Sequence, residues 1–193
     1  MSMGIVEDIR AYQPWNEQEE ADKARILAFI AANENAFLRE NSLAHMTASA
    51  WITDPSRQKL LMVYHRIYDS WSWTGGHADG EEDLLAVAMR EAMEETGLQS
   101  VRPVSPEIYS LEVLTVDGHQ KRGKYVPSHL HMNVSYLLQA DPSQPLKVCP
   151  QENSGVKWFD KEAALKASSE PWFVERIYKK LNEKLELFPP DQA

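Results

Sequence analysis

The sequence has almost no cysteine and no long hydrophobic run. Cys149 is the only cysteine, so an internal disulfide is impossible, as is usual for a cytoplasmic protein. No apolar stretch approaches the roughly 20 residues of a membrane-spanning helix. The opening residues, MSMGIVEDIR, lack the basic start and apolar centre of a secretory signal. We therefore expect a cytoplasmic protein with no membrane partner.

Positive charge is also scarce. The chain has 20 lysines and arginines against 29 aspartates and glutamates, which gives a formal net charge of −9. This balance argues against a nucleic-acid partner, and it disfavours an anionic substrate unless metal ions or a basic patch offset it. One basic patch lies in the glycine-flanked segment 118–124, where Arg122 and Lys124 are candidate substrate-binding residues. A solvated loop explains the same residues equally well.

Glutamate, in contrast, is concentrated in the segment 76–98, GHADGEEDLLAVAMREAMEETGL. Glu91, Glu94 and Glu95 have the spacing i, i+3 and i+4, so they share one face of a helix. Like charges placed in this way repel one another and destabilise the helix. A divalent cation would reverse that effect, and Mg²⁺ suits the arrangement because it is held by carboxylate and phosphate oxygens.

A solvated acidic helix is the other interpretation of this segment. Two details favour a functional site. Gly75 and Gly76 precede the predicted helix and Gly97 follows it as a C-terminal cap. Arg90 lies four residues before Glu94 and eight after Glu82, so it can pair with carboxylates on both sides.

The segment resembles the Nudix box, Gly-x5-Glu-x7-Arg-Glu-U-x-Glu-Glu-x-Gly-U, in which U is aliphatic. The matching positions are Gly76, Glu82, Arg90, Glu91, Ala92, Glu94, Glu95, Gly97 and Leu98. Ala92 is small for an aliphatic position. The resemblance covers about residues 44–165. It implies an α/β fold, namely an α/β/α sandwich with a mixed sheet, in which helices lie before, within and after the strands.

The resemblance also implies a function. Nudix hydrolases use Mg²⁺ or Mn²⁺ to split a diphosphate linkage in a nucleoside diphosphate derivative or a related organic pyrophosphate. The implied partner is thus a small phosphoanhydride, and a homodimer is common in the family. By resemblance, Glu94 and Glu95 are the central metal ligands, and Glu91 is a ligand or holds the attacking water. The Gly76 carbonyl completes the ligand set.

Two further box residues have implied roles, and one candidate lies outside the box. Glu82 is a carboxylate that either supports the metal ligands or binds an outer metal ion, and it is also a candidate for substrate binding. Arg90 holds the cluster by ion pairs. Many family members supply another carboxylate shortly before a Trp-Phe strand, where this chain has Glu152. Glu152 is therefore a candidate catalytic residue, and a glutamate in a surface loop is the alternative.

Four aromatic or imidazole side chains are further candidates for substrate binding. His129 and His131 alternate along a predicted strand, on the same face as Asn133 and Ser135. This polar face favours a substrate-binding wall over a solvent-facing surface, and hard oxygen ligands elsewhere disfavour a His-x-His metal site. Trp73 could stack on a base or belong to the core. His77 directly follows Gly76 and could contact a phosphate or be an ordinary loop residue.

The chain divides into an N-terminal helical extension, residues 1–43, and a Nudix-type domain, residues 44–193. Asn16 is the predicted N-cap of a helix in the segment 14–42, and a second short helix is expected near residues 36–40. The predicted strands are 46–53, 59–65, 108–116, 130–138 and 156–159, and the later helices are 82–96, 161–167 and 171–187.

Two other functions compete with hydrolysis. The stretch Trp73-Thr74 followed by His77 is similar to that of isopentenyl diphosphate isomerase, but no cysteine lies nearby and the glutamate box is intact. A nucleotide-binding Nudix-like regulator without activity is the third hypothesis. Such domains tend to lose box glutamates, and none is lost here.

Overall fold

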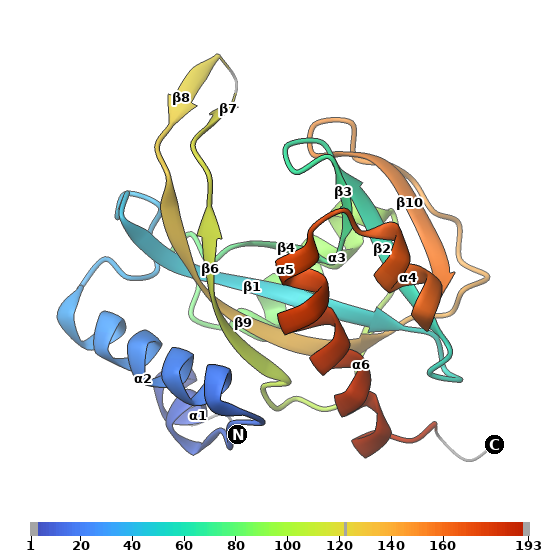
Figure 1. Cartoon of the computed structure of the whole chain (residues 1–193), viewed down its shortest axis with the longest axis horizontal. Coiled ribbons are helices and arrows are strands. Elements are labelled where there is room, and N and C mark those ends of the chain that lie inside the picture. Colours follow the sequence, from blue (N-terminus) through green and yellow to red (C-terminus); the bar gives the residue numbers. More distant parts are fainter. Residues whose placement is uncertain (1–3, 122, 191–193) are drawn as a thin grey trace. The chain divides into compact units, whose positions relative to one another are not determined.

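The computed structural model describes residues 4–121 and 123–190. It divides into two compact units, each built from three segments of the chain. Unit 1 comprises Met1–Ser49, Gly75–Ala88 and Pro106–Tyr136, and unit 2 comprises Ala50–Thr74, Met89–Ser105 and Leu137–Ala193. Figure 1 labels the helices and strands. The predicted α/β fold with a mixed sheet and N-terminal helices is confirmed.

In unit 1, two N-terminal helices accompany the strands. The helices are α1 (Ile5–Ala11) and α2 (Glu17–Ala32). Asn16 is the N-cap of α2, as predicted, because its side chain accepts a hydrogen bond from the Glu19 backbone amide at 3.0 Å. Asp22 of α2 accepts a hydrogen bond from the backbone amide of Val113 at 3.0 Å, so this helix lies along strand β6 (Ser110–Val116).

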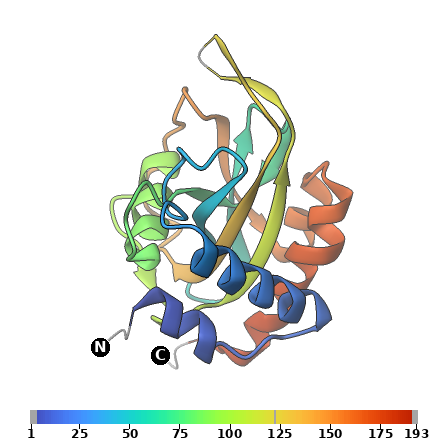
Figure 2. The ribbon, with the colours of Figure 1, turned by 90° about the vertical axis from the view of Figure 1, so that its left-hand side faces the viewer.

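The strands of unit 1 meet around β9 (His129–Gln139), which continues into unit 2. β9 pairs with β6 in antiparallel register, with Glu112 opposite Asn133 and Leu114 opposite His131. β1 (Ala44–Thr53) pairs with β4 (Thr74–His77) and neighbours β9. β7 (His119–Lys121) and β8 (Lys124–Val126) form a two-stranded sheet that projects from β6 and β9 (Figures 1 and 2).

The prediction of a short helix near residues 36–40 is wrong, because the structure has successive turns there. The Asn41 side chain donates to the side-chain oxygens of Asn33 and Asn35, at 3.3 and 3.1 Å. Asparagine side chains of this kind compete with the helical backbone pattern. The carbonyl of Ala36 accepts from the amide of Met46 at 2.8 Å, so the turns are tied to the start of β1.

A buried polar network joins α2 to β6 and β9 within unit 1. Glu19 accepts a hydrogen bond from the Ser110 hydroxyl at 2.7 Å, and Ser110 also contacts Glu112. Glu112 accepts from the Asn133 amide at 3.0 Å and from the Ser135 hydroxyl at 2.9 Å. All five side chains are buried. The predicted substrate-facing wall is therefore not supported for Asn133 and Ser135, because their polar groups bond to other side chains.

In unit 2, strand β2 (Lys59–His65) lies between β10 (Asn153–Asp160) and the end of β1, and β3 (Ser70–Ser72) also pairs with β2. These pairings are antiparallel. β5 (Arg102–Pro103) pairs with the end of β9. The helical elements that follow β10 are α4 (Lys161–Ala167), α5 (Pro171–Phe173), the π-helical turn Val174–Tyr178, α6 (Lys179–Lys184) and the 3-10 turn Leu185–Leu187.

Aromatic side chains fill the interior of unit 2. The ring of Tyr178 stacks on Trp51, with centroids 5.2 Å apart, and meets Trp73 edge-on at 5.8 Å. Trp73 is only 8% exposed and also contacts Phe173. This placement favours the core-packing interpretation of Trp73 over stacking on a substrate base.

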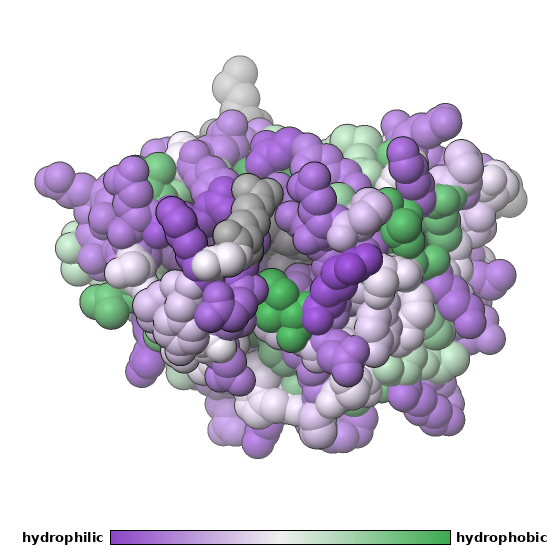
Figure 3. Space-filling model, turned by 90° about the horizontal axis from the view of Figure 1, so that it is seen from above, coloured by the Kyte–Doolittle hydropathy of each residue, from purple (hydrophilic) through white to green (hydrophobic). Residues whose placement is uncertain are grey.

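Hydrophilic side chains dominate the face seen in Figure 3. No helix among the described residues is long and apolar enough to cross a membrane.

Candidate metal centres

Unit 2 brings three glutamates together. Glu91 and Glu95 lie one turn apart on α3 (Leu84–Thr96), and Glu152 lies in the loop before β10. One carboxylate oxygen of each residue lies within 4.8 Å of the others. Glu95 is 3% exposed, whereas Glu91 and Glu152 are half-buried. The cluster is thus partly open to solvent, with one carboxylate held in the interior.

Asn153 fixes the position of the Glu152 loop. Its fully buried side-chain amide donates to the backbone carbonyl of Glu95 at 2.8 Å. Its side-chain oxygen accepts from the backbone amide of Cys149 at 3.1 Å. The carbonyl of Glu152 in turn accepts from the amide of Arg66 at 3.2 Å. One asparagine therefore connects the loop to the turn of α3 that carries Glu95.

Gly97 explains how the chain can pass so close to the end of α3. It has φ of +74°, a conformation that L side chains rarely adopt. A Cβ atom at this position would lie 2.6 Å from the Cβ of Lys147. The amide of Lys147 donates to the carbonyl of Thr96 at 2.8 Å. The glycine required by the motif therefore serves both as a helix C-cap and as the point of contact with the loop that leads to Glu152.

The remaining box residues lie nearer the solvent. Arg90 is exposed and forms an ion pair with Glu91 at 3.6 Å, so it can orient that carboxylate. Glu94 is exposed on α3 and does not belong to the cluster of Glu91, Glu95 and Glu152. Glu82 is exposed in unit 1. The roles of Glu82 and Glu94 stay predictions.

The three clustered carboxylates fit a hard divalent cation. Mg²⁺ and Mn²⁺ prefer carboxylate oxygens, and Mg²⁺ is commonly held by one or two carboxylates together with substrate phosphates. Glu91 and Glu95 repel each other on one helix face, and Glu152 adds a third negative charge. A bound cation would offset this repulsion, so the donor set agrees with the expected cofactor.

Unit 1 holds the other predicted residues. Gly75 and Gly76 belong to β4, and a Cβ at Gly75 would lie 2.7 Å from the carbonyl oxygen of Ala48, so a side chain does not fit there. Lys124 is exposed on β8. Arg122 lies outside the described residues.

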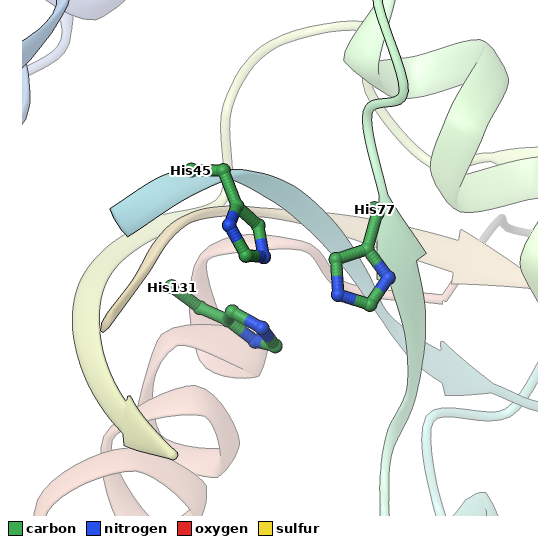
Figure 4. A group of neighbouring side chains, drawn as sticks. All are labelled: His45, His77 and His131. Carbon is green, nitrogen blue, oxygen red and sulfur yellow. The ribbon is translucent and has the colours of Figure 1, made fainter. Parts of the chain in front are cut away.

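A second cluster in unit 1 consists of histidines. His45 of β1, His77 of β4 and His131 of β9 point toward one another (Figure 4), and one nitrogen of each lies within 4.8 Å of the others. His129 joins them, because its Nε2 lies 3.2 Å from Nε2 of His131. The sequence singled out His77, His129 and His131 but missed His45. The i, i+2 spacing of His129 and His131 is visible in the sequence. His45 lies more than eighty positions before them, so no local pattern connects it with the other histidines.

Burial keeps these imidazoles neutral. It lowers the pKa of His131 to about 2, with further contributions from His77 and His45. It also lowers the pKa of His77 to about 3, assisted by the positive charge of Arg39. The pKa of His45 is lowered mainly by burial, although its hydrogen bond to Asn41 acts in the opposite direction.

Comparisons with known proteins agree with the resemblance. The chain is 29% identical to the nucleoside diphosphate-linked moiety X motif 6 protein of Xenopus laevis over 133 residues, 67% of this chain and 56% of that protein. It is 32% identical to the m7GpppN-mRNA hydrolase NUDT17 of Xenopus laevis over 114 residues, 56% of this chain and 36% of that protein. The chain thus spans about half of one curated relative and about a third of the other.

The fold agrees as well. A NUDIX-family hydrolase structure from Clostridium perfringens matches with a TM-score of 0.52 and 22% identity, over 74% of this chain and 97% of that one. The sequence model of the NUDIX domain matches residues 43–181, which is more than half of the chain. The protein therefore belongs to the NUDIX domain family.

Proposed function

We propose that this protein is a metal-dependent hydrolase that splits a diphosphate linkage in a nucleoside diphosphate derivative. The observation that carries the proposal is the cluster of Glu91, Glu95 and Glu152, assembled from the box helix and a distant loop. The curated relatives support the substrate class, because their names refer to a nucleoside diphosphate-linked moiety and to a capped mRNA.

In this proposal Glu91 and Glu95 would hold Mg²⁺ or Mn²⁺, and the ion would supply neutralisation of charge on the phosphate oxygens and activation of water. Glu152, the third carboxylate of the cluster, would accept the proton of the attacking water. The new bond joins the water oxygen to phosphorus while the bridging P–O bond breaks, which releases two phosphate-containing products. Arg90 orients Glu91 through the ion pair, and Asn153 keeps Glu152 beside Glu95.

The substrate carries several negative charges, and the chain as a whole is acidic. Positive charge must therefore offset this repulsion. Lys124 of β8 is an exposed cation of the basic segment, and we assign it to phosphate binding. Because this side chain reaches solvent, its contribution should weaken as ionic strength rises.

The test is phosphate-coupled turnover with Mg²⁺ over a panel of ADP-ribose, nucleoside triphosphates, dinucleoside polyphosphates and sugar nucleotides. We expect turnover of at least one compound, and Glu95→Gln should lower kcat by orders of magnitude because it removes a buried metal ligand. Glu162→Gln, at an exposed position on α4, is the control and should retain the wild-type rate.

Two outcomes would contradict the proposal. One is no turnover of any compound by the metal-loaded wild type. The other is a Glu95→Gln protein that turns over as fast as Glu162→Gln. Glu94→Gln belongs in the same assay, since the family resemblance predicts a large loss of kcat while the exposed position of Glu94 predicts a smaller one than for Glu95→Gln.

A further inference from the structure

The histidine cluster has no part in the proposed hydrolysis. Five of the six histidines of the chain belong to unit 1, and three of them converge from different strands. Figure 4 shows His45, His77 and His131 with their rings directed toward a common point. Their ring centroids lie 5.0 to 5.1 Å apart in each pair. Each imidazole has two nitrogens that need a hydrogen-bond or metal partner. Three buried or half-buried imidazoles placed so close together therefore require an explanation.

Hydrogen bonds at the outer edge of the cluster fix which nitrogen faces inward. His45 Nδ1 lies 3.0 Å from the carbonyl oxygen of Asn41, so Nδ1 carries the proton and Nε2 keeps its lone pair. His45 is 4% exposed, and its Nε2 is buried without a hydrogen-bond partner among the described residues. Metal-binding histidines almost always show this arrangement, in which the second nitrogen donates to a backbone carbonyl.

His129 supports the cluster in a similar way. Its Nδ1 lies 2.8 Å from the carbonyl oxygen of Pro127, and its Nε2 lies 3.2 Å from Nε2 of His131. The Pro127 carbonyl can only accept, so His129 Nδ1 carries a proton. His129 is thereby held against His131 and restricts the rotation of that ring.

We propose that His45, His77 and His131 bind a divalent transition-metal ion such as Zn²⁺, with His129 as a positioning residue. Imidazole nitrogens favour Zn²⁺, Cu²⁺, Fe²⁺ and Ni²⁺, whereas Mg²⁺ prefers oxygen. Zn–N bonds of about 2.0–2.1 Å in a tetrahedral site place the nitrogens roughly 3.3 Å apart. The three nitrogens already lie within 4.8 Å of one another, so small ring rotations complete the site.

Three histidines leave the fourth position of a tetrahedral ion open to water or to an anionic oxygen, as in catalytic rather than structural zinc sites. Half-buried His77 and His131 give access from solvent. The proposal does not depend on hydrolysis, since it involves different residues and different ligand chemistry from the glutamate cluster.

The test measures Zn²⁺ binding in the presence of excess Mg²⁺, which competes for the carboxylates. The chelator-treated full chain is titrated with Zn²⁺ against a chromophoric chelator, and the stoichiometry is confirmed by elemental analysis. We expect about one Zn²⁺ per chain and at least a tenfold loss of affinity in His77→Asn and in His131→Asn. His65→Asn, which removes a histidine of unit 2, is the matched control and should bind as the wild type does.

X-ray absorption spectroscopy of the Zn²⁺-loaded protein gives an independent measurement of the ligands. The proposal predicts three imidazole nitrogens at about 2.0–2.1 Å. Circular dichroism shows whether each variant is folded, and two half-buried positions are tested so that misfolding of one variant does not decide the result. Oxygen-only coordination would overturn the assignment. So would a Glu91→Gln/Glu95→Gln protein that loses Zn²⁺ while a folded His131→Asn protein retains it.

Discussion

Asn153→Ala should weaken both the fold and the glutamate cluster. The substitution removes two hydrogen bonds, one to the Glu95 carbonyl and one from the Cys149 amide. Each such bond contributes about 0.5–1.5 kcal/mol net, and an unsatisfied buried acceptor costs about 1–3 kcal/mol. Because Glu95 is buried, we expect a loss of about 2–4 kcal/mol in the free energy of unfolding.

The same substitution should lower metal affinity, because Glu152 is no longer held next to Glu95. Loss of a group that orients a metal ligand typically lowers affinity about 10- to 100-fold. Urea unfolding followed by circular dichroism gives the stability, and calorimetric titration with Mn²⁺ gives the affinity. Neither Glu91 nor Glu95 is changed, so the helix ligands remain in place.

Leu60→Ala is the control for general destabilisation. Leu60 is 1% exposed and pairs with Phe159, at the opposite end of the β2–β10 pairing from Asn153. Truncation of a buried leucine costs about 2–5 kcal/mol, a similar amount, but Leu60 does not belong to the glutamate cluster. The reasoning is refuted if Asn153→Ala binds Mn²⁺ as tightly as the wild type. It is equally refuted if Leu60→Ala loses as much affinity as Asn153→Ala.

Two further substitutions in unit 2 test the backbone conformation at Gly97 and the raised pKa of Glu170. Gly97→Ala should lower the free energy of unfolding by more than about 1 kcal/mol, because it combines positive φ with a contact to Lys147. Gly123→Ala is the matched control, since Gly123 has a similar φ of +75° but no atom within 4 Å of its Cβ position; equal losses in urea unfolding would remove the role of the Lys147 contact. Burial raises the pKa of Glu170 above its ordinary value of 4.5. The native state thus keeps this proton more strongly than the unfolded state, so stability should fall as pH rises from about 4.5 toward the raised pKa. Glu170→Gln should raise the melting temperature at pH 7 and flatten this pH dependence; an unchanged profile would show that Glu170 is not responsible.

The sequence predicted the box helix because its signals are local. Glutamate spacing, the preceding glycines and Gly97 all act within a few residues, and the structure has α3 at Leu84–Thr96 against the predicted 82–96. The strand at 59–65 and the helix at 161–167 agree with the structure residue for residue. The asparagine-rich turns after α2 were mistaken for a helix because their side-chain bonds and their link to β1 have no periodic pattern.

The sequence by itself determined the family, the box helix and the carboxylates available for a metal. Only the tertiary structure decided which carboxylates lie together. Glu152 lies close to Glu95 because the side chain of the adjacent Asn153 donates a hydrogen bond to the Glu95 carbonyl. No local sequence pattern encodes a contact between residues so far apart in the chain. The same holds for His45, which joins His77 and His131 only where three strands converge. Periodicity specifies the face on which a residue lies, whereas strand pairing and loop closure specify its neighbours.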